Sequence, residues 1–330
     1  MVRYVKWGYK RRAAFIANQT TSCGKEWCAQ TVRGLSSSRP LNVSQSSRRP
    51  GRRRRAALVP DSIRHVIVLM LENRSFDHLL AYSGIPALQG VDTSKTNPGP
   101  TGSVIRMDNK APDRAGSDPG HEFEDVDWQI FRSTYTAKPR PATLTGFVDR
   151  GGSSSMQCAA PTLIPVFTHL ARHFMVCDQW FSSMPGPTWP NRFFVHAGSS
   201  GGLANSPSNL TTIGSMLWSK VGFSFQYGTI FDRLTKAKRT WRVYHGDHFP
   251  QVCAINTMPS VFVASSDKFR PQKRFTQDAA DGDLPDYIFI EPDYGILSKF
   301  RNGNSQHPCG TLSAGEELVA EIAKDRKSVV

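Results

Sequence analysis

One apolar run constrains the fold of this chain more than any other feature of its sequence. Residues 63–71 are almost unbroken in apolar character and rich in β-branched side chains. Such a run is typical of a strand buried on both faces of a parallel sheet. It stops abruptly at Glu72-Asn73-Arg74, and Ser75 then opens a helical pattern. The sequence therefore predicts an α/β fold with a mainly parallel sheet.

Further segments continue this alternation of strands and helices. Helical spacing predicts helices over residues 163–174 and 230–234, and a last helix that begins with a capping box formed by Ser313 and Glu316. Short apolar stretches predict three more strands, 174–177, 241–244 and 287–290. Residues 84–120 are rich in Gly, Pro, Asp and Asn, which indicates a long excursion from the sheet.

Polar residues follow four of the predicted strands: Glu72-Asn73, Asp178, His245 and Glu291. In open α/β sheets, ligands bind at the carboxyl ends of the strands, so these positions are candidate site residues. A glutamate directly after an apolar strand is half-buried, and an unpaired carboxylate there is costly. A bound divalent cation or a neighbouring arginine would each offset the cost of burying this carboxylate. Spacing alone does not separate metal binding from a helix-capping or salt-bridge role.

The charge of the chain lies almost entirely in its first residues. The formal net charge is +14, and residues 1–57 hold fourteen Lys or Arg residues and one acid, Glu26. The charge therefore says little about the substrate of the folded part, and no specific nucleic-acid partner is expected. A DNA-binding role through Arg52–Arg55 is the weakest alternative.

We expect residues 1–58 to form a basic, disordered leader and residues 59–330 to form one catalytic domain. The leader contains no apolar stretch of the kind that a signal peptide needs. Cys23 and Cys28 have no second Cys or His pair nearby, which argues against a zinc site there. The remaining cysteines are scattered and leave the redox compartment open.

Several separated motifs resemble one known family in the correct order. They are residues 69–78 (Leu-Met-Leu-Glu-Asn-Arg-Ser-Phe-Asp-His), residues 181–192 with Pro187-Thr188-Trp189-Pro190-Asn191-Arg192, residues 241–244, and His307-Pro308 with Gly315-Glu316. Together they resemble the phosphoesterase family of bacterial phospholipases C and acid phosphatases over residues 62–325. The resemblance implies an alkaline-phosphatase-like three-layer α/β/α sandwich and hydrolysis of phosphoester bonds. It also implies a phospholipid or other phosphoester substrate and contact with a membrane surface.

The resemblance also assigns roles to individual residues. Glu72 and Asn73 match the positions that hold one divalent metal ion, and Thr188 matches the hydroxyl nucleophile, which also binds the metal. His121 and His307 resemble histidines that contact the phosphoryl oxygens. His245 is a third such candidate, with a looser local match, and His248 competes for its role. A threonine hydroxyl attacks phosphorus only when its alkoxide is stabilised, and metal coordination supplies that stabilisation.

The sequence departs from the family at its end. Family members continue to a strand ending in a motif close to Asp-Glu-His-Gly-Gly, whose carboxylates complete the metal site, and this chain contains no such motif. We therefore expect the domain to be incomplete at its carboxyl end and the catalysis of this chain to be weak or absent.

The leading functional hypothesis is a phospholipase C that cleaves glycerophospholipid head groups. A broad acid phosphatase is the alternative within enzymes, and a catalytically dead truncated remnant is the alternative outside them. The family is usually exported, but the leader provides no signal peptide, so the localisation stays open.

Overall fold

The computed structural model describes residues 63–72, 74–86, 88, 92–133, 139–208, 211, 214 and 222–328, together with the backbone of residues 3–9 and 12–18. A six-stranded sheet with the order β1-β2-β3-β8-β6-β7 forms its centre. Its strands are β1 (Arg3–Tyr9), β2 (Arg12–Asn18), β3 (Val66–Met70), β6 (Trp241–His245), β7 (Phe269–Pro271) and β8 (Tyr287–Glu291). All neighbouring pairs are parallel except β1 and β2. The mixed α/β fold with a mainly parallel sheet is therefore as the sequence predicts.

Strand β3 shows why these residues form the centre of the sheet. Its side chains alternate between two separate apolar clusters: Ile67 and Leu69 belong to one, and Val68 and Met70 to the other. Each of these four side chains is at most 8 % exposed. A strand with apolar residues on both faces needs cover on both faces, and this explains the unbroken apolar run in the sequence.

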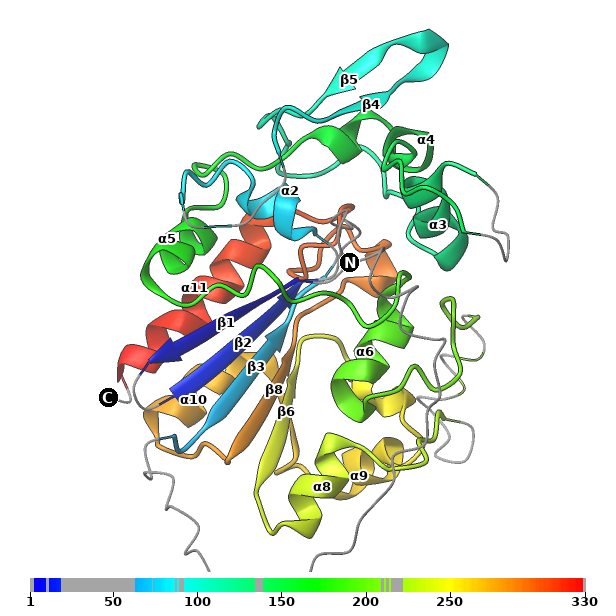
Figure 1. Cartoon of the computed structure of the whole chain (residues 1–330). Coiled ribbons are helices and arrows are strands. Elements are labelled where there is room, and N and C mark those ends of the chain that lie inside the picture. The colour runs from blue at the N-terminus through cyan, green and yellow to red at the C-terminus, as the bar shows by residue number, and fades with distance from the viewer. Residues whose placement is uncertain are drawn as a thin grey trace, which may run out of the picture.

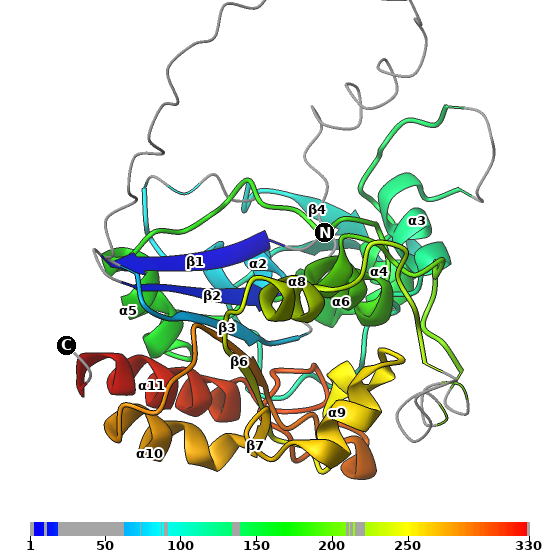
Figure 2. The same ribbon diagram turned by 90° about the horizontal axis from the view of Figure 1, so that it is seen from below.

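Helices provide this cover on each side of the sheet (Figures 1 and 2). Helices α5 (Pro165–His173), α10 (Phe275–Ala280) and α11 (Leu312–Ser328) contribute to the cluster that contains Leu69. Helices α6 (Thr188–Ala197), α8 (Ile230–Lys236) and α9 (Met258–Ala264) contribute to the cluster that contains Met70. Helix α2 (Phe76–Leu80) follows β3 directly, and Ser75 caps it by accepting a hydrogen bond from the backbone N–H of His78 at 2.8 Å.

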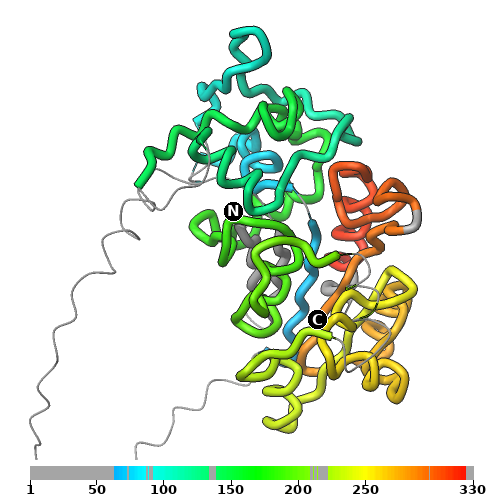
Figure 3. Tube along the Cα trace, turned by 90° about the vertical axis from the view of Figure 1, so that its right-hand side faces the viewer, coloured from blue at the N-terminus to red at the C-terminus, as the bar shows by residue number. Residues whose placement is uncertain are grey.

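The chain between α2 and α5, which includes the excursion predicted over residues 84–120 and continues past it, lies beyond the end of the sheet at which β3 leads into α2 (Figures 1 and 3). It contains a small antiparallel hairpin of β4 (Thr96–Pro98) and β5 (Val104–Arg106), and helices α3 (Phe123–Phe131) and α4 (Phe147–Gly151). Short 3-10 helices at Pro100–Gly102, Ser153–Met156, Gln251–Ala254, Gln272–Arg274 and Ile296–Ser298 complete the described elements. Among the described residues, none of the helices has the length and apolar character that a bilayer crossing requires.

The predicted strand over residues 174–177 is wrong. Phe174 ends α5 in an extended conformation, and the residues after it form a connection outside the sheet. Met175 in this connection is 59 % exposed. Both edges of β3 are already paired, one with β8 and the other with β2, so this segment has no free edge beside β3 to join. Asp178 consequently does not lie at the end of a strand.

The leader differs from the sequence prediction where it is described. Residues 3–9 and 12–18, for which the sequence predicts disorder, form the antiparallel strands β1 and β2, and β2 extends the sheet parallel to β3. Arg52–Arg55, Cys23 and Cys28 lie outside the described residues. The domain division at residue 58 stays a prediction.

The predicted capping box of the last helix is also wrong. Helix α11 begins at Leu312, and the hydroxyl of Thr311 accepts a hydrogen bond from the N–H of Ala314 at 3.3 Å. The carboxylate of Glu316 instead accepts hydrogen bonds from the N–H groups of Val166 at 2.6 Å and Phe167 at 3.2 Å. The N–H groups in the first turn of α5 have no partner within that helix, so the buried Glu316 side chain of α11 caps α5.

This arrangement makes stability depend on pH. Burial raises the pKa of Glu316 to about 7 from 4.5, although its two N–H partners oppose the shift. The unfolded chain loses this proton near 4.5 and the folded chain near 7, so between these values the folded state binds more protons. Glu316 therefore makes the free energy of unfolding fall as pH rises through this window. We expect Glu316→Gln to remove this fall. Between pH 5 and pH 8, the free energy of unfolding of the variant should therefore rise by about 3 kcal/mol relative to that of the parent chain.

Urea unfolding at the two pH values measures this difference. Glu317 is exposed on the same helix, and Glu317→Gln should change stability by less than about 0.5 kcal/mol. An equal effect of Glu316→Gln at both pH values would show that the folded chain holds this carboxyl ionised throughout.

Candidate active site

Glu72 lies just beyond the carboxyl end of β3 and is buried, with 6 % of its surface exposed. Its backbone N–H donates to the carbonyl of Ser305 at 3.0 Å, which fixes the chain at this point. Its Oε2 atom accepts no hydrogen bond within the described structure. The guanidinium of Arg192 approaches this oxygen, with Nη2 at 3.6 Å. The arginine partner that the sequence left as one alternative is therefore present.

The electrostatic surroundings of Glu72 include two other predicted site residues, Thr188 and His121. Burial raises the pKa of Glu72, and Arg192, a hydrogen bond from the Thr188 side chain and the charge of His121 oppose this shift. Asp118 adds to the rise. The structure thus brings Glu72, Thr188 and His121 together, although residues 72 and 188 belong to different elements far apart in the sequence.

Thr188 is the first residue of α6, and the turn before it is held by a side chain from the helix itself. Asn191 donates from Nδ2 to the carbonyls of Met184 at 3.1 Å, Gly186 at 3.2 Å and Pro187 at 3.0 Å, and its Oδ1 accepts from the N–H of Met184 at 3.2 Å. Asn191 is 1 % exposed. The tight turn and the helix start are therefore one rigid unit that fixes the position of the Thr188 backbone.

We expect Asn191→Ala to destabilise the fold by about 2–3 kcal/mol, because it leaves several backbone groups of this turn unpaired. Thermal or urea unfolding of the purified variant measures the loss. The exposed Asn302 is the control position, where alanine should cost less than about 0.5 kcal/mol. Equal effects at the two positions would mean that solvent replaces the hydrogen bonds of Asn191.

Arg192 is the residue of this site that sequence reasoning missed. It is 2 % exposed and lies between two buried carboxylates: its Nη1 is 3.4 Å from Oε1 of Glu291, and it also donates to the hydroxyl of Tyr294. Glu291 ends β8 and accepts hydrogen bonds from the N–H groups of Gln251 at 2.7 Å and Val252 at 3.0 Å. The signal was available, because a buried carboxylate needs a cation and Arg192 stands in the same motif as Thr188.

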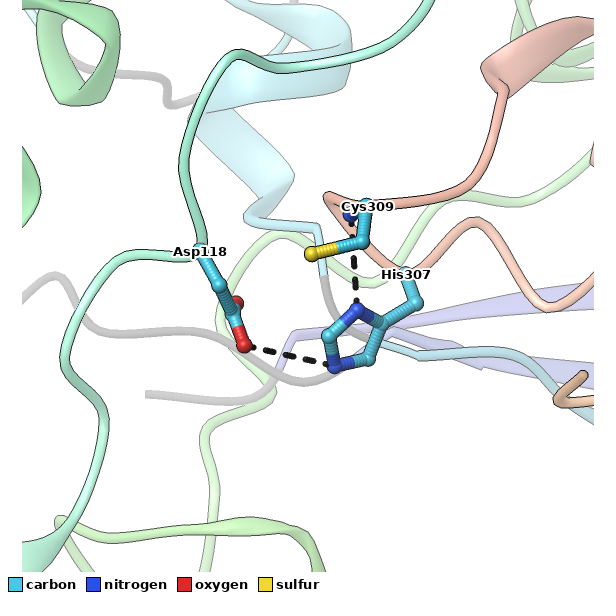
Figure 4. Close-up of side chains that lie close together, drawn as sticks. All are labelled: Asp118, His307 and Cys309. Carbon is cyan, nitrogen blue, oxygen red and sulfur yellow. Dashed lines mark hydrogen bonds and ion pairs between the residues drawn. The ribbon is translucent and has the colours of Figure 1, made fainter. Parts of the chain in front are cut away.

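His307 lies near Asp118 (Figure 4), and the charge of His121 acts on it. It is 4 % exposed, and its Nε2 is 3.7 Å from Oδ2 of Asp118. Burial, together with the charges of His121 and Arg74, lowers the pKa of His307 to about 3. His307 is therefore neutral near pH 7. His121 is oriented by a hydrogen bond between its Nδ1 and the carbonyl of Pro119 at 2.8 Å.

His245 ends β6 as the sequence predicts, but its contacts belong to another group of residues. Its Nδ1 lies 2.6 Å from the carbonyl of Asp247, and its ring packs edge-on against Phe262 at 5.7 Å. Burial lowers its pKa. Neither contact residue belongs to the group around Glu72 and Thr188, so the role assigned to His245 stays a prediction. Asn73 lies outside the described residues.

The described group can act on an anionic ester. A hydroxyl beside a buried carboxylate is placed to become a nucleophile, and histidines next to it can donate or accept protons at the reacting oxygens. The position at the carboxyl ends of parallel strands is where open α/β sheets bind ligands.

Comparisons with known proteins identify the family. The phosphoesterase family is matched over residues 63–328. Non-specific phospholipase C6 of Arabidopsis thaliana is 32 % identical over 276 residues, which cover 81 % of this chain and 50 % of that protein. Non-specific phospholipase C3 of the same plant is 33 % identical over 279 residues, 79 % of this chain and 50 % of that protein.

A bacterial relative is more distant. The non-hemolytic phospholipase C of Pseudomonas aeruginosa is 26 % identical over 220 residues, 62 % of this chain and 30 % of that protein. The chain spans about half the length of the plant relatives that it matches. The match over residues 63–328 includes Glu72, Thr188 and His307 and most of the sheet, and the chain therefore belongs to the phosphoesterase family.

Proposed function

We propose that this chain hydrolyses phosphoester bonds in the manner of a phospholipase C, with a glycerophospholipid as the substrate. One observation carries the proposal: the side chain of Thr188 interacts with a buried carboxylate, Glu72, just beyond the carboxyl end of β3, and the charge of His121 acts on the same carboxylate. The family membership and the names of the relatives, which are phospholipases C, support the same reaction class.

In this proposal Thr188 is the nucleophile. Its oxygen attacks the phosphorus, the bond to the diacylglycerol oxygen breaks, and the phosphorylated head group is transferred to the threonine. A water molecule then attacks the same phosphorus and releases the head group. His121 and His307 hydrogen-bond to the phosphoryl oxygens, and a histidine of this group gives a proton to the leaving oxygen and takes one from water. His245 stays the third candidate for this role.

The donor atoms at Glu72 and Thr188 fit one divalent ion. Oε2 of Glu72 is buried and without a hydrogen-bond partner within the described structure, and a carboxylate and a hydroxyl are oxygen ligands of the kind that hard cations take. Glu72, Thr188 and Asn73 would hold the ion. When bound, it would lower the pKa of the Thr188 hydroxyl and offset phosphoryl charge.

We also propose that the fold is the alkaline-phosphatase-like three-layer α/β/α sandwich. The two apolar clusters on opposite faces of the sheet, each lined by helices, support this arrangement. Contact with a membrane surface is a further part of the proposal, since a phospholipid substrate resides in a bilayer. The expectation of no specific nucleic-acid partner stays a prediction.

Hydrolysis of phosphatidylcholine and of p-nitrophenyl phosphate by the purified 330-residue chain, assayed side by side with added divalent metal, tests the proposal. The deciding comparison is with Thr188→Ala rather than the absolute rate. We expect release of the head group from phosphatidylcholine by the parent chain and none by the variant. Hydrolysis of p-nitrophenyl phosphate alone would favour the phosphatase alternative. No hydrolysis of either substrate above the variant would overturn the proposal.

A further inference from the structure

Asp118, His307 and Cys309 form a second group of potential ligands beside the candidate active site. Their ligating atoms, a carboxylate oxygen, a ring nitrogen and a thiol sulfur, all lie within 4.8 Å of one another. Figure 4 shows the Cys309 sulfur and the Asp118 carboxylate directed toward the same side of the His307 ring. The group differs in kind from the oxygen atoms that Glu72 and Thr188 offer, because it contains sulfur and nitrogen.

The backbone that carries these residues is fixed by contacts between two distant segments. The N–H of Ala115 donates to the carbonyl of Pro308 at 3.0 Å, and Nη1 of Arg114 donates to the carbonyl of Cys309 at 2.7 Å. Arg74 holds the chain on both sides of His307, through the carbonyls of Gln306 at 2.9 Å and Pro308 at 3.4 Å. The three ligand positions are thus preorganised rather than brought together by chance contacts of mobile side chains.

The ring of His307 is held in an orientation that directs one nitrogen into the group. It stacks on Phe300 with a centroid distance of 4.1 Å and an interplanar angle of 13°. Nδ1 lies 3.5 Å from the backbone nitrogen of Cys309, and Nε2 faces Oδ2 of Asp118 at 3.7 Å. This second distance is too long for a hydrogen bond, so the imidazole and the carboxylate face each other without bonding. The ring is neutral near pH 7, and because the N–H of Cys309 points at Nδ1, an ion that binds Nε2 must displace the ring proton from that nitrogen.

The charges around the thiol are mixed. Burial and the charge of Asp118 raise the pKa of Cys309, whereas Arg301, Arg74 and Arg114 lower it. The balance keeps the thiol protonated in the absence of a ligand, so a metal that binds its sulfur must displace that proton. A thiolate and a carboxylate together then carry two negative charges, which match those of a divalent ion.

We propose that Asp118, His307 and Cys309 bind a thiophilic divalent ion, with zinc as the best fit. One sulfur, one nitrogen and one oxygen ligand are the donor types that zinc takes, and three protein ligands leave a fourth tetrahedral position open. The carboxylate–hydroxyl pair of the active site suits hard cations instead. The site shares His307 with the proposed hydrolysis, but metal coordination is measured without turnover, so the two proposals can fail separately.

Titration of the full chain with Co²⁺ tests the site, because a cobalt–thiolate bond gives a charge-transfer absorption that oxygen ligands do not produce. We expect this absorption in the parent chain, its disappearance when an equimolar amount of Zn²⁺ is added, and its loss in Cys309→Ser. Cys177→Ser is the matched control, since Cys177 is also a free and partly exposed thiol. It should keep the absorption unchanged.

Asp118→Asn provides a second variant that keeps the thiol. We expect it to retain the absorption while weakening cobalt affinity about tenfold or more. Circular dichroism of each variant establishes that it is folded. Absence of the absorption in the parent chain, or its persistence in Cys309→Ser through another cysteine pair such as Cys23 and Cys28, would overturn the proposal. Unchanged affinity in Asp118→Asn would remove Asp118 from the site and so also overturn it.

Discussion

Replacing Thr188 by alanine is expected to reduce hydrolysis of phosphatidylcholine to the level of a reaction without protein. Thr188 supplies the oxygen that attacks phosphorus in the proposed reaction, and its side chain interacts with the buried carboxylate of Glu72. Loss of a nucleophile costs about 10⁴-fold or more in turnover. The fold should be little affected, because Thr188 lies at the start of α6 and the turn before it is held by Asn191.

Thr188→Ser is the matched control for this loss. It keeps the hydroxyl and removes only a methyl group, so turnover within about tenfold of the parent chain is expected. Head-group release measured for the three proteins under identical conditions gives the comparison. Equal rates for Thr188→Ala and the parent chain would remove Thr188 from the reaction. A serine variant as inactive as the alanine variant would mean that the methyl group, rather than the oxygen, matters.

Replacing Arg192 by methionine is expected to cost the largest amount of stability, about 3–5 kcal/mol. The guanidinium lies between Glu72 and Glu291, all three groups are buried, and burial raises the pKa of Glu291 to about 7 even with Arg192 in place. Methionine has a similar length but no charge. The variant would leave these two buried carboxylates without their arginine partner.

Arg239 offers a control of the same residue type. Its side chain is 65 % exposed and pairs with Asp286 at 3.3 Å, so Arg239→Met should cost less than about 1 kcal/mol. Urea unfolding of both variants at one pH measures the two costs. A loss of less than about 1 kcal/mol at Arg192 as well would indicate that Glu72 and Glu291 take up protons and tolerate the change.

The central strands could be predicted because their sequence pattern is local. The run before Glu72 is apolar on both faces, and only a strand inside a covered parallel sheet needs such a pattern. The predicted strands that end at His245 and Glu291 lie in the same sheet for the same reason. The wrong strand at 174–177 shows the limit of this reasoning. Apolar character indicates that a segment can pair, but which edges of the sheet are already occupied depends on residues far away.

How far each site residue could be predicted from the sequence also has a physical cause. Glu72 stood out because a carboxylate at the end of a buried strand requires a partner. Thr188, taken alone, was a turn residue, and only the family motif gave it a role. The pairing of Asp118 with Cys309 spans a long stretch of sequence and depends on how the excursion folds back, which no local pattern records. Arg192 and Asn191 act through buried contacts that become visible only with the tertiary structure.

The most direct test of the central claim is to trap the phosphorylated protein. The parent chain and Thr188→Ala are mixed with phosphatidylcholine and divalent metal, quenched in acid during turnover, digested and sequenced by mass spectrometry. We expect the phosphorylated head group on Thr188 in the parent chain and on no residue in the variant. Head-group release by the parent chain with Thr188 unmodified, or with the modification on another residue, would contradict the assignment of Thr188 as the nucleophile.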